Sequence, residues 1–304
     1  MGVASHGGDE ASSSTPRALF GYDVLAPIGT GAGSTIYCVS HPLTKQLYAL
    51  KHVVRKTEKD ERFIEQLQTE FDVGSKVVSP HLRRSIDFKV NHAGLLRRPV
   101  DAALVLDLFD GISLEEQTPR DLMSIVGAFI QTASGLRALH EMGYVHCDLK
   151  PNNILRDPAT GAVRVIDLGQ AAKIGTAKTR VQGTPDYMAP EQVKLLPVTI
   201  RTDVFNFGAT LYFCLTAKKL PTLFNLKKTE NSFLVDDKIA TPIELNPHIP
   251  EQLSNLVMEC VRTSPPKRPA DMVELGRRLD IIEFTLERHA NRQATAPNSA
   301  LMAG

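Results

Sequence analysis

Two short segments concentrate the side chains that could carry out a reaction. Residues 146–155 (HCDLKPNNIL) place ionisable and amide groups in a loop between apolar stretches, and residues 163–169 (VRVIDLG) form an expected strand that ends in Asp167. Asp167 and Asn153 offer oxygen ligands of the kind that Mg²⁺ prefers, with waters and substrate phosphates completing its coordination. The sequence therefore predicts a site where two carboxylates, an amide and a lysine converge.

A glycine-rich segment, residues 28–34 (IGTGAGS), could bind phosphate groups. Because Gly29, Gly31 and Gly33 lack side chains, their backbone N–H groups can approach phosphate oxygens closely. The alternative is an ordinary hairpin turn with glycines at positive φ. The segment lacks the GxxxxGK[ST] pattern of a P-loop, and no helix follows it as a dinucleotide-binding fold requires. Its place between two expected strands is the main indication.

Lys51 lies inside an apolar strand, in the sequence YALKHVV. Because an unpaired ammonium group is costly to bury, Lys51 must have an anionic partner. Glu70, on the helix that follows, is the best candidate, since a Lys–Glu pair leaves ammonium hydrogens available to a ligand phosphate. The alternative for Glu70 is a solvated charge on an exposed helix face.

The elements of the first third of the chain follow from its hydrophobic pattern. Phe63, Leu67 and Phe71 recur every four positions among charged neighbours, which indicates an amphipathic helix. The expected elements are a disordered leader at 1–18, strands from 19 to about 52, a helix at 59–78, and strands at 85–90 and 102–108.

Beyond Gly111 the pattern changes to that of helices. A broad apolar face between Leu122 and Leu139 predicts a long helix that ends near Gly143. Residues 201–218 are expected to form a largely buried helix, and residues 270–290 a long final one. The predicted fold class is therefore α+β, with a small antiparallel sheet and one helix in a first lobe and a mainly helical second lobe.

Composition limits the classes of partner and compartment. The 304 residues include 35 basic and 34 acidic ones, so a formal net charge of +1 offers no broad cationic surface for nucleic acid or membrane. The four cysteines lack the spacing of a zinc site or a disulfide scaffold, which favours a reduced protein. No signal-peptide pattern and no stretch of about 20 apolar residues is evident. We therefore expect a cytoplasmic protein that binds neither nucleic acid nor membrane.

Taken together, the motifs resemble those of the eukaryotic-type protein kinases. The family pattern HRDxKxxN is met by His146, Asp148, Lys150 and Asn153, DFG by the sequence DLG and APE by the sequence APE, in the family's order. The lysine two places after Asp148 is similar to that of the serine/threonine branch. A chain with no attached sensor domain would suit a soluble bacterial member.

The resemblance implies the two-lobed protein kinase fold and its boundaries. The implied domain limits are a kinase domain at 19–285, divided into an N-lobe at 19–108 and a C-lobe at 109–285, with the end of the last helix and a flexible tail at 286–304.

The same resemblance implies ATP-dependent transfer of the γ-phosphoryl group to serine or threonine hydroxyls of a protein substrate, with Mg²⁺ or alternatively Mn²⁺. Asp148 would accept the proton of the substrate hydroxyl, and Lys150 would neutralise charge on the transferring phosphate. Asn153 and Asp167 would bind the metal. Lys51 would pair with Glu70 and hold the α- and β-phosphates.

Further residues are assigned by the resemblance to nucleotide binding or to the scaffold. Core packing is the alternative reading for the apolar ones. The implied nucleotide set is Gly29, Gly31, Gly33 and Ser34 over the phosphates, Ile28, Ile36, Ala49 and Leu155 at the adenine, Leu106 behind it, and Asp107 to Phe109 as the hinge. The implied scaffold is Asp203 anchoring the catalytic loop and an ion pair of Glu191 with Arg268, while Thr184 would bond Asp148 and Lys150.

The chain departs from the family pattern at four positions. Ser34 replaces the third loop glycine, Gly33 replaces an aromatic residue at the loop tip, and Leu168 replaces phenylalanine. Cys147 replaces the arginine that in many kinases receives a phosphate from the activation segment. We therefore expect activity that does not depend strongly on phosphorylation of that segment. Cys147 is expected to be a small buried residue, with a redox sensor as the alternative.

Two other classes of function remain open. A pseudokinase that binds nucleotide or partners without chemistry would retain the fold, although such proteins usually lack the lysine or one of the aspartates. A small-molecule kinase of the aminoglycoside or choline type shares the fold, but those enzymes lack the segment from Gly183 to Glu191. The sequence leaves the oligomeric state and the protein substrate undetermined.

Overall fold

The computed structural model describes residues 15–31, 33–95, 97–221 and 239–295, which divide into two compact units. Unit 1 comprises Met1–Ile64 and Asp87–Leu108, and unit 2 comprises Glu65–Ile86 and Phe109–Gly304. The junction after Leu108 coincides with the predicted end of the N-lobe, whereas residues 65–86 group with unit 2. Most of the predicted leader and the last residues of the predicted tail lie outside the described residues.

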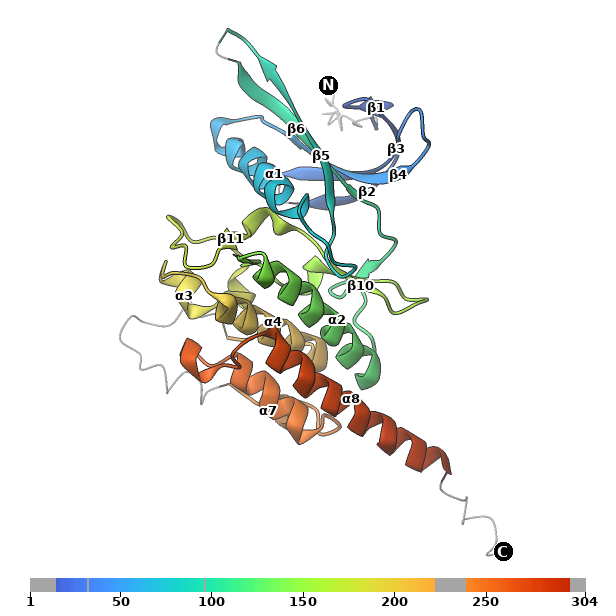
Figure 1. The fold of residues 1–304 in the computed structure, drawn as a ribbon, viewed down its shortest axis with the longest axis vertical. Helices are drawn as coiled ribbons and strands as arrows, with labels where there is room; N and C mark the ends of the chain where they lie inside the picture. The colour runs from blue at the N-terminus through green and yellow to red at the C-terminus, as the bar shows by residue number, and fades with distance from the viewer. Residues whose placement is uncertain (1–14, 32, 96, 222–238, 296–304) are drawn as a thin grey trace, which may run out of the picture. The chain divides into compact units, whose positions relative to one another are not determined.

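Unit 1 is built on a six-stranded antiparallel sheet in the order β1-β2-β3-β4-β6-β5, whose labelled strands are drawn in Figure 1. Its strands are β1 (Ala18–Leu19), β2 (Tyr22–Gly31), β3 (Ser34–Ser40), β4 (Leu47–Val54), β5 (Ser85–Ala93) and β6 (Arg98–Asp107). The run from Ala102 to Leu106 on β6 is fully buried, as expected for a continuous apolar strand. The predicted strand-rich N-lobe is confirmed.

The predicted amphipathic helix is α1 (Glu61–Gly74), preceded by a short 3₁₀ turn at Glu58–Asp60. The 3₁₀ turn begins after Thr57, whose backbone N–H and hydroxyl both donate to the Asp60 carboxylate, so this turn is capped by its own side chains. Of the predicted apolar face, Leu67 is buried and Phe63 and Phe71 are partly buried, and Ile64, which was not predicted, is buried with them. Gly74 ends the helix beside Ser85.

Unit 2 is mainly helical, and the three helices predicted in it are present as α2, α4 and α8. Asp121 caps α2, because its carboxylate accepts the Ser124 backbone N–H at 2.7 Å. The helices are α2 (Leu122–Glu141), α3 (Pro190–Val193), α4 (Ile200–Thr216), α6 (Pro242–Leu245), α7 (Glu251–Cys260) and α8 (Met272–Thr295). Short strands join them: β7 (Ile112–Ser113), β9 (Ile154–Arg156) and β10 (Val163–Val165) form one sheet, and β8 (Tyr144–Val145) pairs with β11 (Ala172–Lys173).

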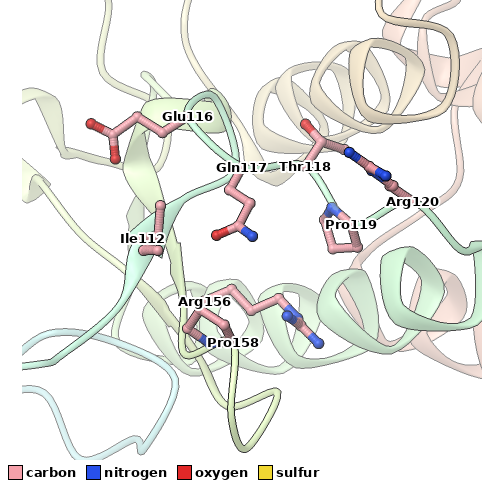
Figure 2. A pocket seen from close by; sticks show the side chains of 8 residues that line it. All are labelled: Ile112, Glu116, Gln117, Thr118, Pro119, Arg120, Arg156 and Pro158. Atoms are coloured by element: carbon pink, nitrogen blue, oxygen red, sulfur yellow. The ribbon is translucent and has the colours of Figure 1, made fainter.

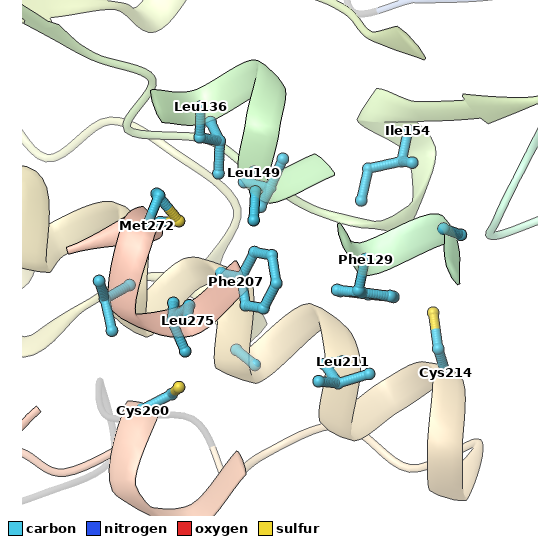
Figure 3. Packing of buried hydrophobic residues seen from close by; sticks show 14 of the residues in the cluster. Phe129, Leu136, Leu149, Ile154, Phe207, Leu211, Cys214, Cys260, Met272 and Leu275 are labelled. Atoms are coloured by element: carbon cyan, nitrogen blue, oxygen red, sulfur yellow. The ribbon is translucent and has the colours of Figure 1, made fainter. Parts of the chain in front are cut away.

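The core of unit 2 lies where α2, α4 and α8 meet. The rings of Phe129 on α2 and Phe207 on α4 pack edge to face with centroids 5.1 Å apart. Figure 3 shows Met272 and Leu275 of α8 close to the Phe207 ring, and α8 runs alongside α2 in Figure 1. This packed core forms the base on which the loop of residues 146–153 lies.

The last helix differs from its prediction. Its apolar residues Met272, Leu275, Leu279 and Ile282 are buried as expected, but α8 continues to Thr295, beyond the predicted end at residue 290. The helices α3, α6 and α7 were not predicted; α3 and α6 have only four residues each, too few to show a helical period.

One described helix, α2, is long and apolar enough by length and composition to cross a membrane. The expectation that no such stretch exists was therefore wrong. Half of the apolar window of α2 is buried inside unit 2, and Ile125, Val126, Phe129 and Leu136 all belong to the core. The apolar composition of α2 is thus explained by core packing.

The buried ion pair of Glu191 and Arg268, predicted as scaffold, is present and fully hydrogen-bonded. Arg268 binds both carboxylate oxygens of Glu191, at 2.7 and 2.9 Å, and donates to the backbone carbonyls of Arg201, Arg262 and Thr263. Its side chain is 0% exposed. Such a pair is costly to break from one side, because the remaining charge stays buried without its partner.

We expect Arg268→Met to lower the free energy of unfolding by about 3–5 kcal/mol, since it leaves the Glu191 carboxylate buried and unpaired. Arg278→Met is the matched control, because the Arg278–Glu259 pair is also bidentate but about one-third to two-fifths exposed. The control should lose only about 0–1 kcal/mol. Urea unfolding of both variants measures the difference, and equal losses would contradict this reading of the Arg268 pair.

Candidate active site

The loop that carries the predicted catalytic residues is held by one buried carboxylate. Asp203 on α4 is 0% exposed and accepts the backbone N–H groups of His146 at 2.8 Å and Cys147 at 2.9 Å. Its Oδ2 also lies 2.8 Å from Nε2 of His140, at the end of α2. Burial acts to raise the pKa of Asp203, but the hydrogen bond and charge of His140 outweigh it, so the pKa lies below its ordinary value. The predicted anchoring role of Asp203 is confirmed.

Asp148 is held from both sides by hydrogen bonds. Its Oδ1 accepts the Thr184 backbone N–H at 2.9 Å and the Thr184 hydroxyl at 3.1 Å, and its Oδ2 accepts Lys150 Nζ at 3.1 Å. Lys150 Nζ also donates to the Thr184 hydroxyl at 2.8 Å. The predicted bonds of Thr184 to Asp148 and Lys150 are thus confirmed, and they fix both the carboxylate and the ammonium group.

Asn153 and Asp167, the predicted metal ligands, belong to adjoining segments of unit 2. Asn153 Nδ2 donates to the Asp148 carbonyl at 2.8 Å, and the Asn153 carbonyl accepts the backbone N–H of Ile166, the residue before Asp167. The nitrogen of the amide is therefore committed to the loop, and its oxygen is the atom suited to a cation. An amide oxygen and a carboxylate fit Mg²⁺, which keeps several waters and binds through few protein ligands.

The backbone at Asp167 has a left-handed conformation, with φ of 65°. Such a conformation is uncommon for a residue other than glycine and occurs often at functional sites. Gly169 follows closely: a Cβ there would lie 3.3 Å from Asp167 Oδ1 and from atoms of Gln66 on α1. The glycine of the DLG motif thus allows the loop and the helix to approach each other.

Cys147 is fully buried and takes no part in any described charge pair. Burial raises the pKa of its thiol well above the ordinary value, so the thiolate needed for a redox sensor is disfavoured. Its carbonyl accepts Gln192 Nε2 at 2.7 Å, and Val145 and Val198 lie in the same apolar cluster. The expectation of a small buried residue is confirmed.

The activation segment, defined here as residues 167–191, is held by hydrogen bonds to β8, to Val198 and within itself. Its strand β11 pairs with β8, and the Thr176 carbonyl accepts the Val198 backbone N–H at 2.9 Å. Lys178 Nζ donates to the Gln170 carbonyl at 2.7 Å, which joins two parts of the segment. Burial lowers the pKa of Lys178, while the nearby Cys147, Asp148 and Asp203 act in the opposite direction.

In unit 1 the strand register gathers four of the predicted nucleotide-binding residues. Ile36 on β3 is directly opposite Lys51 on β4, and Ala49 on β4 is directly opposite Leu106 on β6. Because alternate residues of a strand point to the same face, Ile36, Ala49, Lys51 and Leu106 share one face of the sheet. Asp107 pairs with Tyr48 and belongs to the other face.

The glycine-rich segment forms the ends of β2 and β3, with Gly29 opposite Ile36 and Gly31 opposite Ser34. Gly33 has φ of 79°, and a Cβ there would lie 2.7 Å from the Phe63 ring. The positive φ favours glycine at this position, and any side chain there would also have to displace the Phe63 ring. Ile28, at the start of the segment, is half exposed. Ala32 lies outside the described residues.

Glu70, Leu155 and Phe109 belong to unit 2. Glu70 is 2% exposed, which excludes the alternative of a solvated charge, and one of its partners is Arg83 at 3.6 Å. Leu155 is central in the sheet of β7, β9 and β10, and Arg164 lies over the Phe109 ring at 5.0 Å. The pairing of Glu70 with Lys51 stays a prediction.

Sequence reasoning missed His140, Gln192, Lys178 and Arg83. His140 bonds Asp203 and Gln192 bonds the Cys147 carbonyl, whereas Lys178 bonds Gln170 within the activation segment and Arg83 pairs with Glu70. The only signal for His140 was a polar residue at the end of an apolar helical face. For the other three no local pattern indicated burial.

Unit 2 contains a cavity of about 400 Å³ that is lined by other residues than the candidate active site. Figure 2 shows Gln117 and Pro119 on one side of it and Arg156 with Pro158 on the other. Two arginines, Arg120 and Arg156, line it together with Glu116, so its charge is mixed. None of the predicted catalytic or metal-binding residues lines this cavity.

Comparison with known proteins agrees with the geometry. Residues 22–276 match the family described as protein kinase domain. The relatives include the "Probable serine/threonine-protein kinase" of Clostridium acetobutylicum (26% identical; 81% of this chain and 37% of the relative covered) and the serine/threonine-protein kinase PknD of Chlamydia abortus (27%; 81% and 29%). A third is the serine/threonine-protein kinase AtPK2/AtPK19 of Arabidopsis thaliana (30%; 77% and 50%).

The chain spans half or less of the length of these relatives. The family match nevertheless covers most of the chain, and both the sheet of unit 1 and the helices of unit 2 agree with the two-lobed kinase fold. Together with the bonded loop of Asp148, Lys150 and Asn153, these findings show that the chain belongs to the protein kinase domain family.

Proposed function

We propose that this chain is a serine/threonine protein kinase that transfers the γ-phosphoryl group of ATP to a hydroxyl group of a protein substrate. The observation that supports the proposal best is the fixed trio of Asp148, Lys150 and Thr184, in which every polar side-chain atom of Asp148 and Lys150 has a partner. The names of the relatives point to the same activity.

In this proposal Asp148 is the catalytic base. Its carboxylate orients the acceptor hydroxyl and takes its proton as the oxygen attacks phosphorus. Lys150, held beside it at 3.1 Å, stabilises the negative charge that spreads over the transferring phosphoryl group. Because hydrogen bonds from Thr184 already orient the carboxylate, little reorganisation is needed at the moment of reaction.

Asn153 and Asp167 would hold Mg²⁺, with Mn²⁺ as an alternative. When bound, the ion neutralises charge on the phosphates and fixes their orientation. The hydrogen bond from Asn153 Nδ2 to the Asp148 carbonyl would keep the metal ligand and the base in register.

The residues of unit 1 would bind the nucleotide. Lys51 would hold the α- and β-phosphates and pair with Glu70, and the glycine-rich segment would cover the phosphates with backbone N–H groups. The face shared by Ile36, Ala49 and Leu106 offers apolar surface suited to an adenine ring. We further propose that the protein acts in the cytoplasm, with ATP and a protein substrate as its partners and without nucleic acid or membrane.

Asp148→Asn should reduce turnover by at least about 10²-fold, because an amide cannot accept the proton. Asp280→Asn is the matched control, since Asp280 is an exposed residue of α8. Transfer of ³²P from γ-labelled ATP to a serine-containing peptide measures both. A fully active Asp148→Asn variant would contradict the role of Asp148, and a wild-type chain that binds ATP without transfer would indicate a pseudokinase.

Asp167→Asn should weaken the response to metal specifically. Loss of one carboxylate charge lowers cation affinity, so the variant should need a higher Mg²⁺ concentration for half-maximal rate and should have a lower maximal rate. Initial rates over a series of Mg²⁺ concentrations at saturating peptide give both quantities. An unchanged Mg²⁺ dependence would exclude Asp167 as a ligand.

The activation segment supports an enzyme that is active without phosphorylation. The arginine that would receive a phosphate is replaced by the buried Cys147, and the segment is tied down by β11, Lys178 and Thr184. The Thr184 hydroxyl is already bonded to Asp148 and Lys150, so a phosphate there would bring negative charge against the base.

Phosphatase treatment should therefore leave the turnover number nearly unchanged. The variant with both Thr176 and Thr179 changed to Ala should behave in the same way, since both residues are exposed and their side chains hold no part of the segment. Peptide phosphorylation before and after treatment, with mass spectrometry to confirm loss of phosphate, makes the comparison. A collapse of turnover after treatment would refute the expectation.

A further inference from the structure

Glu70 forms a buried ion pair with an arginine of its own unit. Arg83, in the segment that leads from α1 to β5, lies with its Nη2 3.6 Å from Glu70 Oε1. The Arg83 and Glu70 side chains are only 6% and 2% exposed. Arginine and glutamate are rarely buried to this extent unless they are paired, so the two charges must stabilise each other.

The pair is an ion pair without a hydrogen bond. A separation of 3.6 Å is long for a charge-assisted bond, which is typically about 2.7–2.9 Å. Nε of Arg83 is buried and has no hydrogen-bond partner among the described residues. A buried pair whose hydrogen bonds are incomplete does not recover its cost of desolvation well. Stability of the fold alone is therefore a poor explanation for Arg83.

The segment that carries Arg83 also holds the strand that leads to Asp167. The backbone N–H of Arg83 donates to the Val165 carbonyl at 2.9 Å, and the backbone N–H of Val165 donates to the His81 carbonyl at 2.9 Å. Val165 ends β10, two residues before Asp167. Arg83 thus contacts Glu70 through its side chain and the strand of the metal ligand through its backbone.

A second contact from the same segment reaches α1. The Ser85 hydroxyl donates to the Glu70 carbonyl at 3.0 Å, and Gly74 leaves room for it, because a Cβ there would clash with Ser85. Gln66, one turn before Glu70, packs against Gly169 of the DLG motif. The part of α1 that carries Glu70 is therefore fixed against the metal-binding loop inside unit 2.

From these contacts we infer that Arg83 is a positioning residue of the kinase reaction: its buried guanidinium holds the Glu70 carboxylate in place relative to Asp167. The inference rests on the proposed function, in which Glu70 orients Lys51. Arg83 attracts the Glu70 carboxylate by charge across the 3.6 Å that separate them. In this proposal the charge of Arg83 keeps the Glu70 side chain in place, and Glu70 in turn orients Lys51.

Steady-state kinetics of Arg83→Met test this role. Loss of a residue that orients a catalytic group typically lowers activity by about 10- to 100-fold, and kcat/KM for ATP should fall by this amount. The KM for the peptide should stay unchanged, since Arg83 does not act on the peptide. Arg83→Lys should recover part of the loss because it retains the charge. Arg84→Met is the matched control: Arg84 is the next residue and is exposed, so its kinetics should match the wild type.

Three kinetic results would overturn the inference. One is an Arg83→Met variant as active as Arg84→Met. Another is a loss that raises the KM values for ATP and peptide alike, as general loosening of the fold would. The last is an Arg83→Lys variant as impaired as Arg83→Met.

Unfolding measurements decide the interaction independently of activity. Arg83→Met should destabilise the wild-type chain, but much less the Glu70→Gln variant, because a neutral amide needs no counter-charge. Additive losses in the double-mutant cycle would contradict the pairing. The cycle can be completed even if the wild-type chain transfers no phosphate, so failure of this inference and failure of the proposed function are distinguishable.

Discussion

The position of the catalytic loop depends on the buried carboxylate of Asp203. It is fully buried, and it accepts the two successive backbone N–H groups at the start of the catalytic loop together with a bond to His140. An ionised group in the core is costly unless all of its hydrogen bonds are made, so its presence fixes the path of the loop backbone. Cys147 adopts φ of 66° within this anchored stretch, and Asp148 follows directly. The direction of the Asp148 carboxylate thus follows from a charge in the core of unit 2.

From that anchor, polar contacts extend outward in a continuous set. Gln192 bonds the Cys147 carbonyl, Thr184 bonds Asp148, and Lys150 bonds both Thr184 and Asp148. The bonds of Thr184 join the catalytic loop to the activation segment, and Gln192 follows directly after that segment. In kinases that use an arginine at the position of Cys147, a phosphate makes a comparable connection. Here Thr184 makes it with Asp148 and Lys150, and Lys178 bonds the Gln170 carbonyl within the segment.

Much of the site could be predicted because kinase chemistry depends on residue types at fixed spacing. The motifs around Asp148, Asp167 and Glu191 stand at the expected positions, and the bonds of Thr184, Asp203 and Arg268 agree with the expectation. The long helices were predictable from periodicity, whereas α3 and α6 were too short to show any. The end of α8 was placed too early because residues 291–295 (NRQAT) contain no large apolar side chain, so no hydrophobic period marks this part of the helix.

What could not be predicted are contacts that depend on the tertiary fold. Arg83 reads as one of two adjacent arginines before a strand, and only the packing of residues 81–85 against α1 and β10 buries it. Likewise, the sequence shows Gly33 as a departure from the family pattern, but not its positive φ or the ring of Phe63 beside it. Local propensity carries no information about such neighbours.

The central claim is that this chain transfers phosphate to an aliphatic hydroxyl, and a single comparison of substrates tests it most directly. The purified wild-type chain is incubated with Mg²⁺, labelled ATP and three otherwise identical peptides that carry Ser, Tyr or Ala at the acceptor position, and the product is sequenced by mass spectrometry. The account predicts phosphate on the serine peptide, with none on the tyrosine or alanine peptide. Label confined to tyrosine, or absent from every peptide although the chain binds ATP, would contradict it.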